Sequence, residues 1–587
     1  MKAKIKDWFL GDKKIFQKTN KKIVIFILLL MILSGVVRGY NFKEWLLIRA
    51  DQVRDSGMAR EFLENGVGSL RLLGPKITSV KLPGDAGKGG TLHMGPYYYY
   101  GQAFSMKFFN SASPWTIAIP DLILSILAIP LFYLIISQIF SIKTSLTTTT
   151  LFSFSFLIIQ YSRFSWNPNQ LIFWQLLFIF CLLRFLFEKK KAGNWMIGAF
   201  FSLVIISQLH FLSMVGTTFV FILFFIYQRS WKKLQLKHYL IALFILIFCY
   251  IPVIVSDIKN EGGNYKRLMA SVSQQKSEDT FRKNISETVE KTARFYFYFP
   301  FPVTEEEFKN IELVRFIYLG ASLVLIFLVF LKKTKFLSSI GSKKKRVLAF
   351  LILLYFGIFF LIDFGIADRL EKPRYWISIA PIAFFVLAFW LELIIKTKKS
   401  FWLTGLLILV VSFSFFENVY SIYWYYSSLK EGAKRELPFK DPIIRPHREL
   451  ITFGQIERAS DYMSKKAIKE NKNICYLSTD YQTKNSFKYV ISYKYENLLV
   501  KRLDDLNESS KDCVMFVIAK SDKSIDGVKE DLADRFDYKK IYRDGAITLW
   551  QLKVRRGQDK SKQGDEIFKD TAKLETRTLL WKDVFEK

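Results

Sequence analysis

Residues 21–55 read KKIVIFILLLMILSGVVRGYNFKEWLLIRADQVRD. The apolar run at 23–39 has about the length that a helix needs to cross the hydrocarbon core of a bilayer. Lysines precede this run, and two carboxylates, Asp51 and Asp55, follow it at a short distance. The stretch therefore predicts a membrane span followed by a polar loop that holds acidic groups near the membrane surface.

The rest of the chain repeats the apolar pattern. Of its 587 residues, 51% are hydrophobic and 17% are aromatic, and the apolar residues are gathered in long blocks. This composition is typical of an α-helical polytopic membrane protein and excludes a single soluble domain. About eleven transmembrane helices are predicted, at 23–39, 117–140, 145–161, 170–187, 194–208, 211–228, 238–256, 314–331, 347–364, 375–395 and 401–424.

The net charge of +33 is distributed unevenly along the chain. Basic residues concentrate in alternate connections between the spans, and these connections are nearly free of Asp and Glu. Because cytoplasmic loops carry an excess of Lys and Arg, this pattern predicts a cytoplasmic N-terminus in a plasma (inner) membrane. No basic patch follows a nucleic-acid-binding motif, so no nucleic-acid partner is expected. The basic segments are 2–22, 189–191, 229–237, 332–346 and 396–399.

The pattern divides the chain into three regions. Residues 1–424 are predicted to form a transmembrane module with long outer loops at 40–116 and 257–313. Residues 425–555 alternate helical and strand-like patterns, which indicates a small α/β domain, and 556–587 are predicted to form a charged tail. With an odd number of spans, the C-terminal domain is expected to be extracytoplasmic.

The α/β domain contains two cysteines, Cys475 and Cys513, each in an apolar strand-like run. A disulfide between them suits an extracytoplasmic domain, although sequence spacing alone does not determine the pairing. A short helix at 528–536 and a hairpin at 541–552 are also expected in this domain.

Asp51 and Asp55 lie four residues apart in a segment with helical spacing, so both side chains are expected on one face of a helix. One carboxylate could act as a general base toward an acceptor hydroxyl or amine, or could bind a hard cation. The competing interpretation is a solvated helix in which Arg54 and Arg60 pair with the carboxylates. For two aspartates at this spacing alone, the solvated helix is the better interpretation; the position directly after a span adds weight to a functional role without deciding between the two.

Four further side chains are candidates for substrate binding. His93 and Tyr97 flank a Gly-Pro turn before the second span, although an interfacial aromatic belt would also explain the tyrosines. Asn167 lies in the next outer turn. His210 lies at the end of the fifth span, where a histidine needs a partner, and a buried hydrogen bond explains it as well as a functional role does.

Cations at the ends of spans are candidates for binding a phosphate or a lipid head group. Arg163 could clamp a phosphate with its planar guanidinium, and snorkelling of this side chain is the alternative. Lys266 and Arg267 follow a span and precede an aromatic block, a pattern that also suits a membrane-surface helix without a ligand. Arg374 and Tyr375 repeat the pairing of a cation with an aromatic ring at the start of the tenth span.

These motifs resemble a known family. The first span and the loop after it look like those of GT-C glycosyltransferases of the protein mannosyltransferase and aminoarabinose transferase type, the bacterial glycosyltransferase family 39-like proteins. The similar motifs are the basic-flanked first span, Asp51-Gln52-Val53-Arg54-Asp55, Leu72-Leu73-Gly74-Pro75 and Gly95-Pro96-Tyr97. The segments 163–169 and 208–210 are also similar to bacterial members of this group. The resemblance covers most of residues 20–425.

The resemblance implies a GT-C membrane fold and transfer of a sugar from a polyprenyl-phosphate-linked donor to an extracytoplasmic lipid, glycan or protein acceptor. It implies that Asp51 is the general base and that transfer proceeds with inversion. For Asp55, two roles stay open: a supporting acid or an ion-pair partner. The chain departs from the family at Gln52, where Glu is common, and near Asn169, where an acidic residue is common. These departures weigh against the divalent metal that some relatives bind, and no other cofactor is predicted.

Three other functions remain open from the sequence. An envelope glycan or lipid transporter would need polar residues along a midplane path, and the predicted spans are nearly free of charge. A glycan ligase would need a very long outer loop with paired arginines, which 257–313 only partly provides. A non-enzymatic membrane anchor for the outer domain would make Asp51 and Asp55 dispensable.

Overall fold

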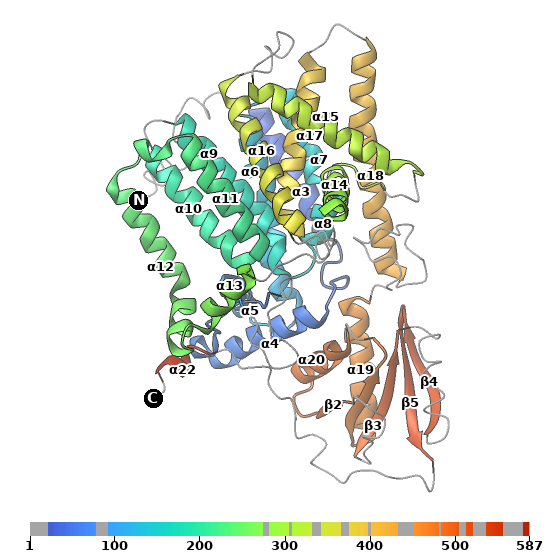
Figure 1. The fold of residues 1–587 in the computed structure, drawn as a ribbon. Coiled ribbons are helices and arrows are strands. Elements are labelled where there is room, and N and C mark those ends of the chain that lie inside the picture. Colours follow the sequence, from blue (N-terminus) through green and yellow to red (C-terminus); the bar gives the residue numbers. More distant parts are fainter. Residues whose placement is uncertain are drawn as a thin grey trace.

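Figure 1 shows the computed structural model, a helical bundle with a small sheet domain at one end. The predicted fold class, an α-helical polytopic membrane protein with a C-terminal α/β domain, is confirmed. The structure describes residues 21–77, 92–188, 191–273, 281–303, 308–331, 342–365, 375–396, 401–431, 451–480, 483–503, 512–520, 536–555 and 579–585.

Within these residues, nine helices are long and apolar enough to cross a membrane, two of them counted with a leading 3-10 turn. They are apolar around most of their circumference because one side packs in the bundle and the other has the composition that lipid requires. They are α3 (Lys21–Gly39), α6 (Trp115–Ile136), α9 (Leu171–Phe187), α10 (Ala192–Leu209), α12 (Leu236–Lys259), α15 (Ile311–Leu331), α16 (Lys343–Gly365), α17 (Ala380–Lys396) and α18 (Phe401–Glu431).

The other two predicted spans are shorter helices, so the count of eleven stays a prediction. The span at 211–228 is α11 (Phe211–Tyr227), and the span at 145–161 is divided into α7 (Ile142–Ser153) and α8 (Phe156–Tyr161). At the division, the backbone N–H of Phe156 donates to the Asn418 side chain at 2.7 Å. A side chain of α18 thus satisfies a backbone group that the interrupted helix leaves without an intrahelical partner.

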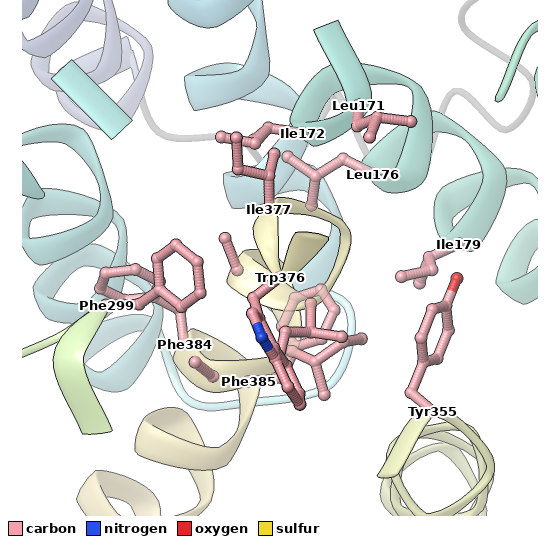
Figure 2. Close-up of a cluster of buried hydrophobic side chains, with 14 of the residues drawn as sticks. Leu171, Ile172, Leu176, Ile179, Phe299, Tyr355, Trp376, Ile377, Phe384 and Phe385 are labelled. Atoms are coloured by element: carbon pink, nitrogen blue, oxygen red, sulfur yellow. The ribbon is translucent and has the colours of Figure 1, made fainter. Parts of the chain in front are cut away.

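Aromatic side chains fill the centre of the bundle. Figure 2 shows Trp376, Phe384 and Phe385 gathered with apolar residues of α9. Phe132 of α6 and Phe152 of α7 stack with ring centroids 4.3 Å apart. The interior also holds paired polar groups, since the buried phenol of Tyr355 donates to Gln175 Oε1 at 2.7 Å. Such pairing is required where no water is available to the polar atoms.

Short helices cover the end of the bundle nearest the sheet domain (Figure 1). Beyond the spans, the remaining helices of the membrane module are α4 (Ala50–Asn65), η1 (Val67–Ser69), α5 (Tyr97–Phe109), η2 (Asn167–Gln170), η3 (Ser230–Lys233), α13 (Gly263–Ser273), α14 (Phe281–Tyr298) and η7 (Ile377–Ile379). Of these, α4, α5 and α13 lie at this end of the bundle.

The C-terminal domain is a five-stranded sheet of order β2-β1-β3-β5-β4, packed against α19 (Phe453–Lys469) and α20 (Lys484–Lys494). The first three strands in this order are parallel, and the last two form the predicted hairpin. The strands are β1 (Asn473–Ser478), β2 (Val500–Arg502), β3 (Cys513–Ala519), β4 (Phe536–Asp544) and β5 (Ile547–Val554). The helix expected at 528–536 lies outside the described residues apart from Phe536, which begins β4.

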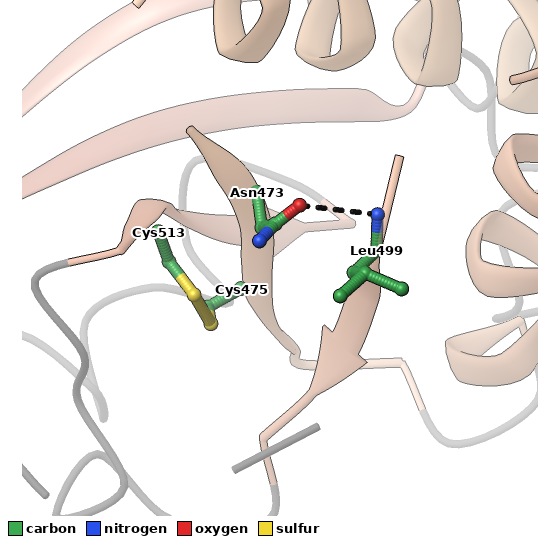
Figure 3. Close-up of a disulfide and its surroundings, with 4 residues drawn as sticks. All are labelled: Asn473, Cys475, Leu499 and Cys513. Carbon is green, nitrogen blue, oxygen red and sulfur yellow. Dashed lines mark hydrogen bonds between the residues drawn. A yellow bond between two sulfur atoms is a disulfide. The ribbon is translucent and has the colours of Figure 1, made fainter. Parts of the chain in front are cut away.

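A disulfide joins Cys475 of β1 to Cys513 of β3, with their Cα atoms 5.5 Å apart. Figure 3 shows it beside the Asn473 side chain, whose Oδ1 accepts from the backbone N–H of Leu499 at 3.2 Å. Side chains alternate along β3, so that Val514 and Phe516 face the helices and Cys513 lies on the opposite face.

The sheet domain is docked on the helices that follow the first span. The backbone N–H of Phe453 donates to the Leu46 carbonyl at 2.7 Å, and the phenol of Tyr489 donates to the Ala112 carbonyl at 2.7 Å. The end of the chain returns to the same region. There α22 (Lys582–Phe585) follows Trp581, whose indole N–H donates to the phenol oxygen of Tyr100 at 2.8 Å.

Candidate functional site

A pocket opens at the end of the bundle where α4 lies. It encloses about 570 Å³ of empty space, part of it open to solvent. Segments far apart in the sequence line it. They are the first turn of α4, the loops at 76–77 and 94, the turn before α9, the break between α10 and α11, and Tyr375, which precedes η7 and α17. The lining residues are Asp51, Arg54, Lys76, Ile77, Met94, Trp166, Asn167, Pro168, His210, Phe211 and Tyr375.

Helix α4 places the two predicted carboxylates in different surroundings. The side chain of Asp51 is 49% exposed and lines the pocket, whereas that of Asp55 is 2% exposed. Arg54 contacts both: its Nη1 is 3.1 Å from Asp51 Oδ1, and its Nη2 is 2.8 Å from Asp55 Oδ1. The ion pairing of the competing interpretation is therefore present for Arg54, while Arg60 pairs with Glu64. Asp51 nevertheless remains open to the pocket.

Burial and neighbouring charges shift the pKa values of Asp55 and Arg54. Burial raises the pKa of the Asp55 carboxyl above its usual range, and the Arg54 guanidinium opposes part of that shift. Burial by itself would lower the pKa of Arg54, but the charges of Asp55 and Asp51 raise it above its usual value. Arg54 is therefore a permanent cation on the pocket wall.

Gln52, the departure from the family pattern, points away from the pocket. Its side-chain N–H donates to the Ser165 carbonyl at 2.7 Å, and its Oε1 accepts from the backbone N–H of Arg49 at 3.1 Å. The amide of Asn169 donates to the Phe164 carbonyl at 2.6 Å. Both side chains hold backbone in place, and neither lines the pocket.

Two short segments pair next to the pocket and fix the position of His93. The backbone N–H of Gly74 donates to the Met94 carbonyl at 2.8 Å, and that of Met94 donates to the Pro75 carbonyl at 3.0 Å. A Cβ on Gly74 would overlap the carbonyl oxygen of Gly95, so the pairing requires glycine at that position. The close approach expected at the Gly-Pro turn is present.

His93 itself is buried beside the pocket and is not among its lining residues. Its Nδ1 lies 2.9 Å from the Gly74 carbonyl, and its backbone N–H and carbonyl both bond to the Asn264 side chain, at 2.8 and 3.1 Å. Burial lowers the pKa of His93 to about 4, with the Gly74 hydrogen bond opposing this shift. The ring is therefore neutral at physiological pH.

The break between α10 and α11 brings His210 into the pocket. The Asn167 side chain donates to the carbonyl of Leu209, which holds the turn before α9 against this break. The ring centroid of His210 lies 5.7 Å from that of Tyr375, and both rings line the pocket. Tyr97 is not a lining residue; its backbone N–H donates to Gln208 Oε1 at 3.2 Å.

The predicted phosphate-binding cations lie in several places. Arg163 is buried, donates to the Arg38 carbonyl and lies under the ring of Tyr426, with its Cζ 4.7 Å from the ring centroid. Lys266 is exposed and Arg267 is half-buried, both on α13, which packs beside the His93 loop and does not line the pocket. Arg374 lies outside the described residues.

The structure adds pocket residues that the sequence pattern did not single out. Lys76 reaches the pocket because 74–77 pairs with 92–95, a contact between segments that sequence periodicity does not reveal. Trp166 and Phe211 lie next to the predicted Asn167 and His210, so motif proximity could have indicated them. The sequence pattern indicates Arg54 only as an ion-pair partner, and in the structure its side chain also lines the pocket.

The residues of the pocket do not fit a divalent metal. In the described part of the chain, no three His, Cys, Asp or Glu side chains gather closely enough to hold a metal ion. The described lining offers one carboxylate, Asp51, together with the cations Arg54 and Lys76. Hard divalent cations require several oxygen ligands, and neighbouring cations oppose their binding.

Comparisons with known proteins address the family and the fold. Residues 93–255 match the family model of dolichyl-phosphate-mannose-protein mannosyltransferases. No curated protein sequence matches the chain. The crystal structure of ArnT from Cupriavidus metallidurans in the apo state aligns with a TM-score of 0.51 and 10% identity, covering 90% of this chain and 98% of that one.

Two further solved structures align at lower similarity. ArnT from the same organism bound to undecaprenyl phosphate gives a TM-score of 0.49 at 10% identity, covering 91% of this chain and 98% of that one. The oligosaccharyltransferase AglB from Archaeoglobus fulgidus, in complex with an inhibitory peptide and a dolichol-phosphate, gives 0.46 at 10% identity, covering 90% and 74%.

At 10% identity, the alignment with apo ArnT establishes the fold. The family model shows that residues 93–255 are similar to dolichyl-phosphate-mannose-protein mannosyltransferases. The resemblance of this chain to GT-C glycosyltransferases of the protein mannosyltransferase and aminoarabinose transferase type is thereby confirmed.

Proposed function

We propose that this protein transfers a sugar from a polyprenyl-phosphate-linked donor to an extracytoplasmic acceptor, with Asp51 as general base and inversion at the sugar. The observation that carries the proposal is a pocket lined by a half-exposed carboxylate, Asp51, which is paired with Arg54, and by a second cation, Lys76. The family model matched by residues 93–255 is named for a donor of this kind, dolichyl-phosphate-mannose.

The reaction balances with the groups of the pocket. An acceptor hydroxyl or amine attacks the anomeric carbon, the bond from that carbon to the phosphate oxygen breaks, and the phosphate leaves with the electron pair. Asp51 takes the acceptor proton, a task for which its exposure suits it better than the buried Asp55. Attack from the face opposite the leaving phosphate inverts the sugar.

Arg54 and Lys76 are the groups that we assign to the departing phosphate. Fixed cations at the point where negative charge develops supply a large part of many enzymatic rate enhancements. The buried carboxylate of Asp55 forms an ion pair with Arg54 and thereby fixes the position of its guanidinium group. We assign Asn167, His210 and Tyr375 to contacts with the sugar or acceptor, since all three line the pocket.

The other predicted residues take supporting places in this proposal. His93 and Tyr97 hold the pocket margin through backbone contacts. We assign Arg163 a structural role in the turn at 162–169, because its side chain donates to the Arg38 carbonyl. Lys266, Arg267 and Arg374 remain proposed contacts for the donor phosphate or for lipid head groups near the membrane surface.

The distribution of charge supports an extracytoplasmic pocket. The turn at Asn167, the break at His210 and Tyr375 line the pocket, and the helices that follow them, α9, α11 and α17, end near Lys191, Arg229 and Lys396. Basic residues thus lie one helix length away from the pocket, as expected if that end is cytoplasmic. The disulfide in the sheet domain also favours an oxidising compartment.

The proposal is tested with purified protein, a panel of labelled polyprenyl-phosphate sugars including polyprenyl-phosphate mannose, and an acceptor-bearing cell-envelope fraction. Release of polyprenyl phosphate is measured for the wild type, Asp51→Asn and Glu64→Gln. Glu64 is the matched control, because it is a half-exposed carboxylate on the same helix that pairs with Arg60.

We expect Asp51→Asn to lower turnover about 100-fold or more, as for loss of a general base, and Glu64→Gln to stay within about twofold of wild type. Turnover by a folded Asp51→Asn protein equal to wild type would remove Asp51 from the proposed role. A wild type that consumes no donor in the panel would contradict the proposed activity.

A further inference from the structure

A buried hydrogen-bond network lies directly behind the pocket wall. Its members are Gln102 and Tyr98 of α5, Ser165 of the turn before α9, and Asp121 of α6, each no more than 1% exposed. Gln102 Nε2 donates to Ser165 Oγ at 2.6 Å, Ser165 Oγ lies 2.7 Å from the phenol oxygen of Tyr98, and that phenol donates to Asp121 Oδ2 at 2.9 Å. The network thus joins α5, α6 and the turn before α9 through buried side chains.

The direction of these hydrogen bonds is determined by chemistry. An amide nitrogen can only donate, and the Tyr98 phenol uses its single proton on Asp121, so the Ser165 hydroxyl must donate to Tyr98. Burial raises the pKa of Tyr98 well above its usual value, which keeps the phenol protonated and able to donate. A chain of bonds running in one direction needs every member in place.

This network connects the two walls of the pocket. On one side, Gln102 Nε2 lies 3.5 Å from Asp55 Oδ2, and Asp55 holds Arg54. On the other side, the backbone N–H of Trp166 donates to Asp121 Oδ2 at 3.4 Å, and Trp166 lines the pocket. A second tie runs from Gln52 of α4 to the Ser165 carbonyl. The separation between the first turn of α4 and the turn at 166–168 is therefore set by buried polar contacts.

We propose that Tyr98 and Asp121 are positioning residues, which hold the Trp166–Asn167 wall at a fixed distance from Asp51 so that the acceptor and the sugar meet in reactive geometry. This inference rests on the proposed function. Neither side chain lines the pocket, so both act through the groups that they hold. A displacement of about 1 Å in a reacting pair can lower a rate about 100-fold while leaving substrate binding largely intact.

The experiment compares Tyr98→Phe with a matched control, Tyr355→Phe. Tyr355 is also a fully buried phenol of the membrane module, and it donates to Gln175 Oε1 at 2.7 Å; neither of these two residues is among the described lining residues of the pocket. Each variant loses one buried hydroxyl, which makes two hydrogen bonds at Tyr98, to Ser165 and Asp121, and one at Tyr355, to Gln175. Thermal unfolding, kcat and the KM for the lipid-linked donor are measured for both variants and the wild type.

We expect both variants to lose thermal stability, Tyr98→Phe more because it removes two buried hydrogen bonds, and a loss of kcat in Tyr98→Phe alone, by about 10- to 100-fold, with donor KM within about threefold of wild type. Equal kcat for Tyr98→Phe and Tyr355→Phe overturns the positioning role. Absence of any turnover by the wild type counts instead against the proposed function, so the two failures are distinguishable.

Variants of Asp121 separate a positioning role from a chemical one. Asp121→Asn keeps an oxygen that can accept from Tyr98, and we expect it to retain most of the kcat. Asp121→Leu removes that acceptor and is expected to show the kcat loss of Tyr98→Phe. A loss in Asp121→Asn as large as that in Asp51→Asn overturns the proposal, because the charge of Asp121 would then matter rather than its hydrogen bond.

Discussion

Asp51 and Asp55 are one helical turn apart and share Arg54, yet only one of them meets the pocket. The sequence spacing predicts a common face of a helix and does not predict how deeply each residue is buried. Depth depends on the neighbours of α4, which are α5, the turn before α9 and the sheet domain. At this scale, the accessible carboxylate is suited to proton transfer and the buried one to support.

The first prediction contrasts the stability of two Asp→Asn variants. Asp55→Asn removes the charge that receives two hydrogen bonds from Arg54, at 3.0 and 2.8 Å, in a buried position. We expect a loss of about 1–2 kcal/mol in the free energy of unfolding, because the partly buried guanidinium of Arg54 loses its buried carboxylate partner. Asp51→Asn should cost less than about 1 kcal/mol, since that ion pair is half-exposed. Thermal unfolding in detergent measures both, and equal losses would contradict the assignment of Asp55 as the supporting acid.

The second prediction concerns pH and His93. Its folded-state pKa of about 4 lies below the usual value of 6.5, so the unfolded chain binds more protons between these two pH values. The stabilising effect of a neutral His93 is therefore fully present above about pH 6.5 and declines as the pH falls toward 4. From pH 7 to pH 5 we expect the free energy of unfolding to fall by about 2 kcal/mol through His93, a decrease that is absent in His93→Asn. The same pH response in both proteins would contradict a buried neutral ring.

At the scale of elements, the pocket depends on two short segments, 74–77 and 92–95, that pair beside it. Their pairing brings Lys76 into the lining of the pocket. The Gly-Pro pattern indicated a tight turn, but no periodicity indicates which distant segment packs against it. Lys76 could therefore not be predicted as a pocket residue, whereas His210 and Asn167 could be.

The third prediction tests this pairing with two Gly→Ala variants. A methyl group at Gly74 would overlap the backbone of Gly95, so we expect a loss of about 2–4 kcal/mol in unfolding free energy. Gly101 of α5 has open space around its Cα, and alanine there should stabilise the helix by up to about 1 kcal/mol. Thermal unfolding of the pair provides the measurement. A tolerated Gly74→Ala would show that the close approach of the two segments is not required.

For the molecule as a whole, hydropathy was sufficient to predict the class, the approximate spans and the separate α/β domain. Apolar blocks of membrane length have few alternative structures, because every backbone polar group must be satisfied within the bilayer. The helix that divides at Ser153 and Phe156 was predicted as one span, since the stabilising Asn418 contact comes from another helix. The docking of Trp581 on Tyr100 was not predicted for the same reason.

The fourth prediction concerns the disulfide that closes 38 residues of the sheet domain. In the chain-entropy account, a loop of this length contributes up to about 4 kcal/mol by restricting the unfolded state. We expect the Cys475→Ser, Cys513→Ser double variant to lose about 2–4 kcal/mol in domain stability. Cys249→Ala, which changes a free half-buried cysteine, is the control and should stay close to wild type. Equal stability of the double variant and the control would contradict a structural disulfide.

The position of the donor phosphate tests the central claim most directly. A cryo-electron microscopy structure of the protein with bound polyprenyl phosphate would locate the phosphorus atom relative to the described pocket. The account predicts that the phosphate contacts Arg54 and Lys76, with the open space beside Asp51 left for the sugar and the acceptor. A phosphate bound outside this pocket, with Asp51 out of reach of the sugar position, would contradict it.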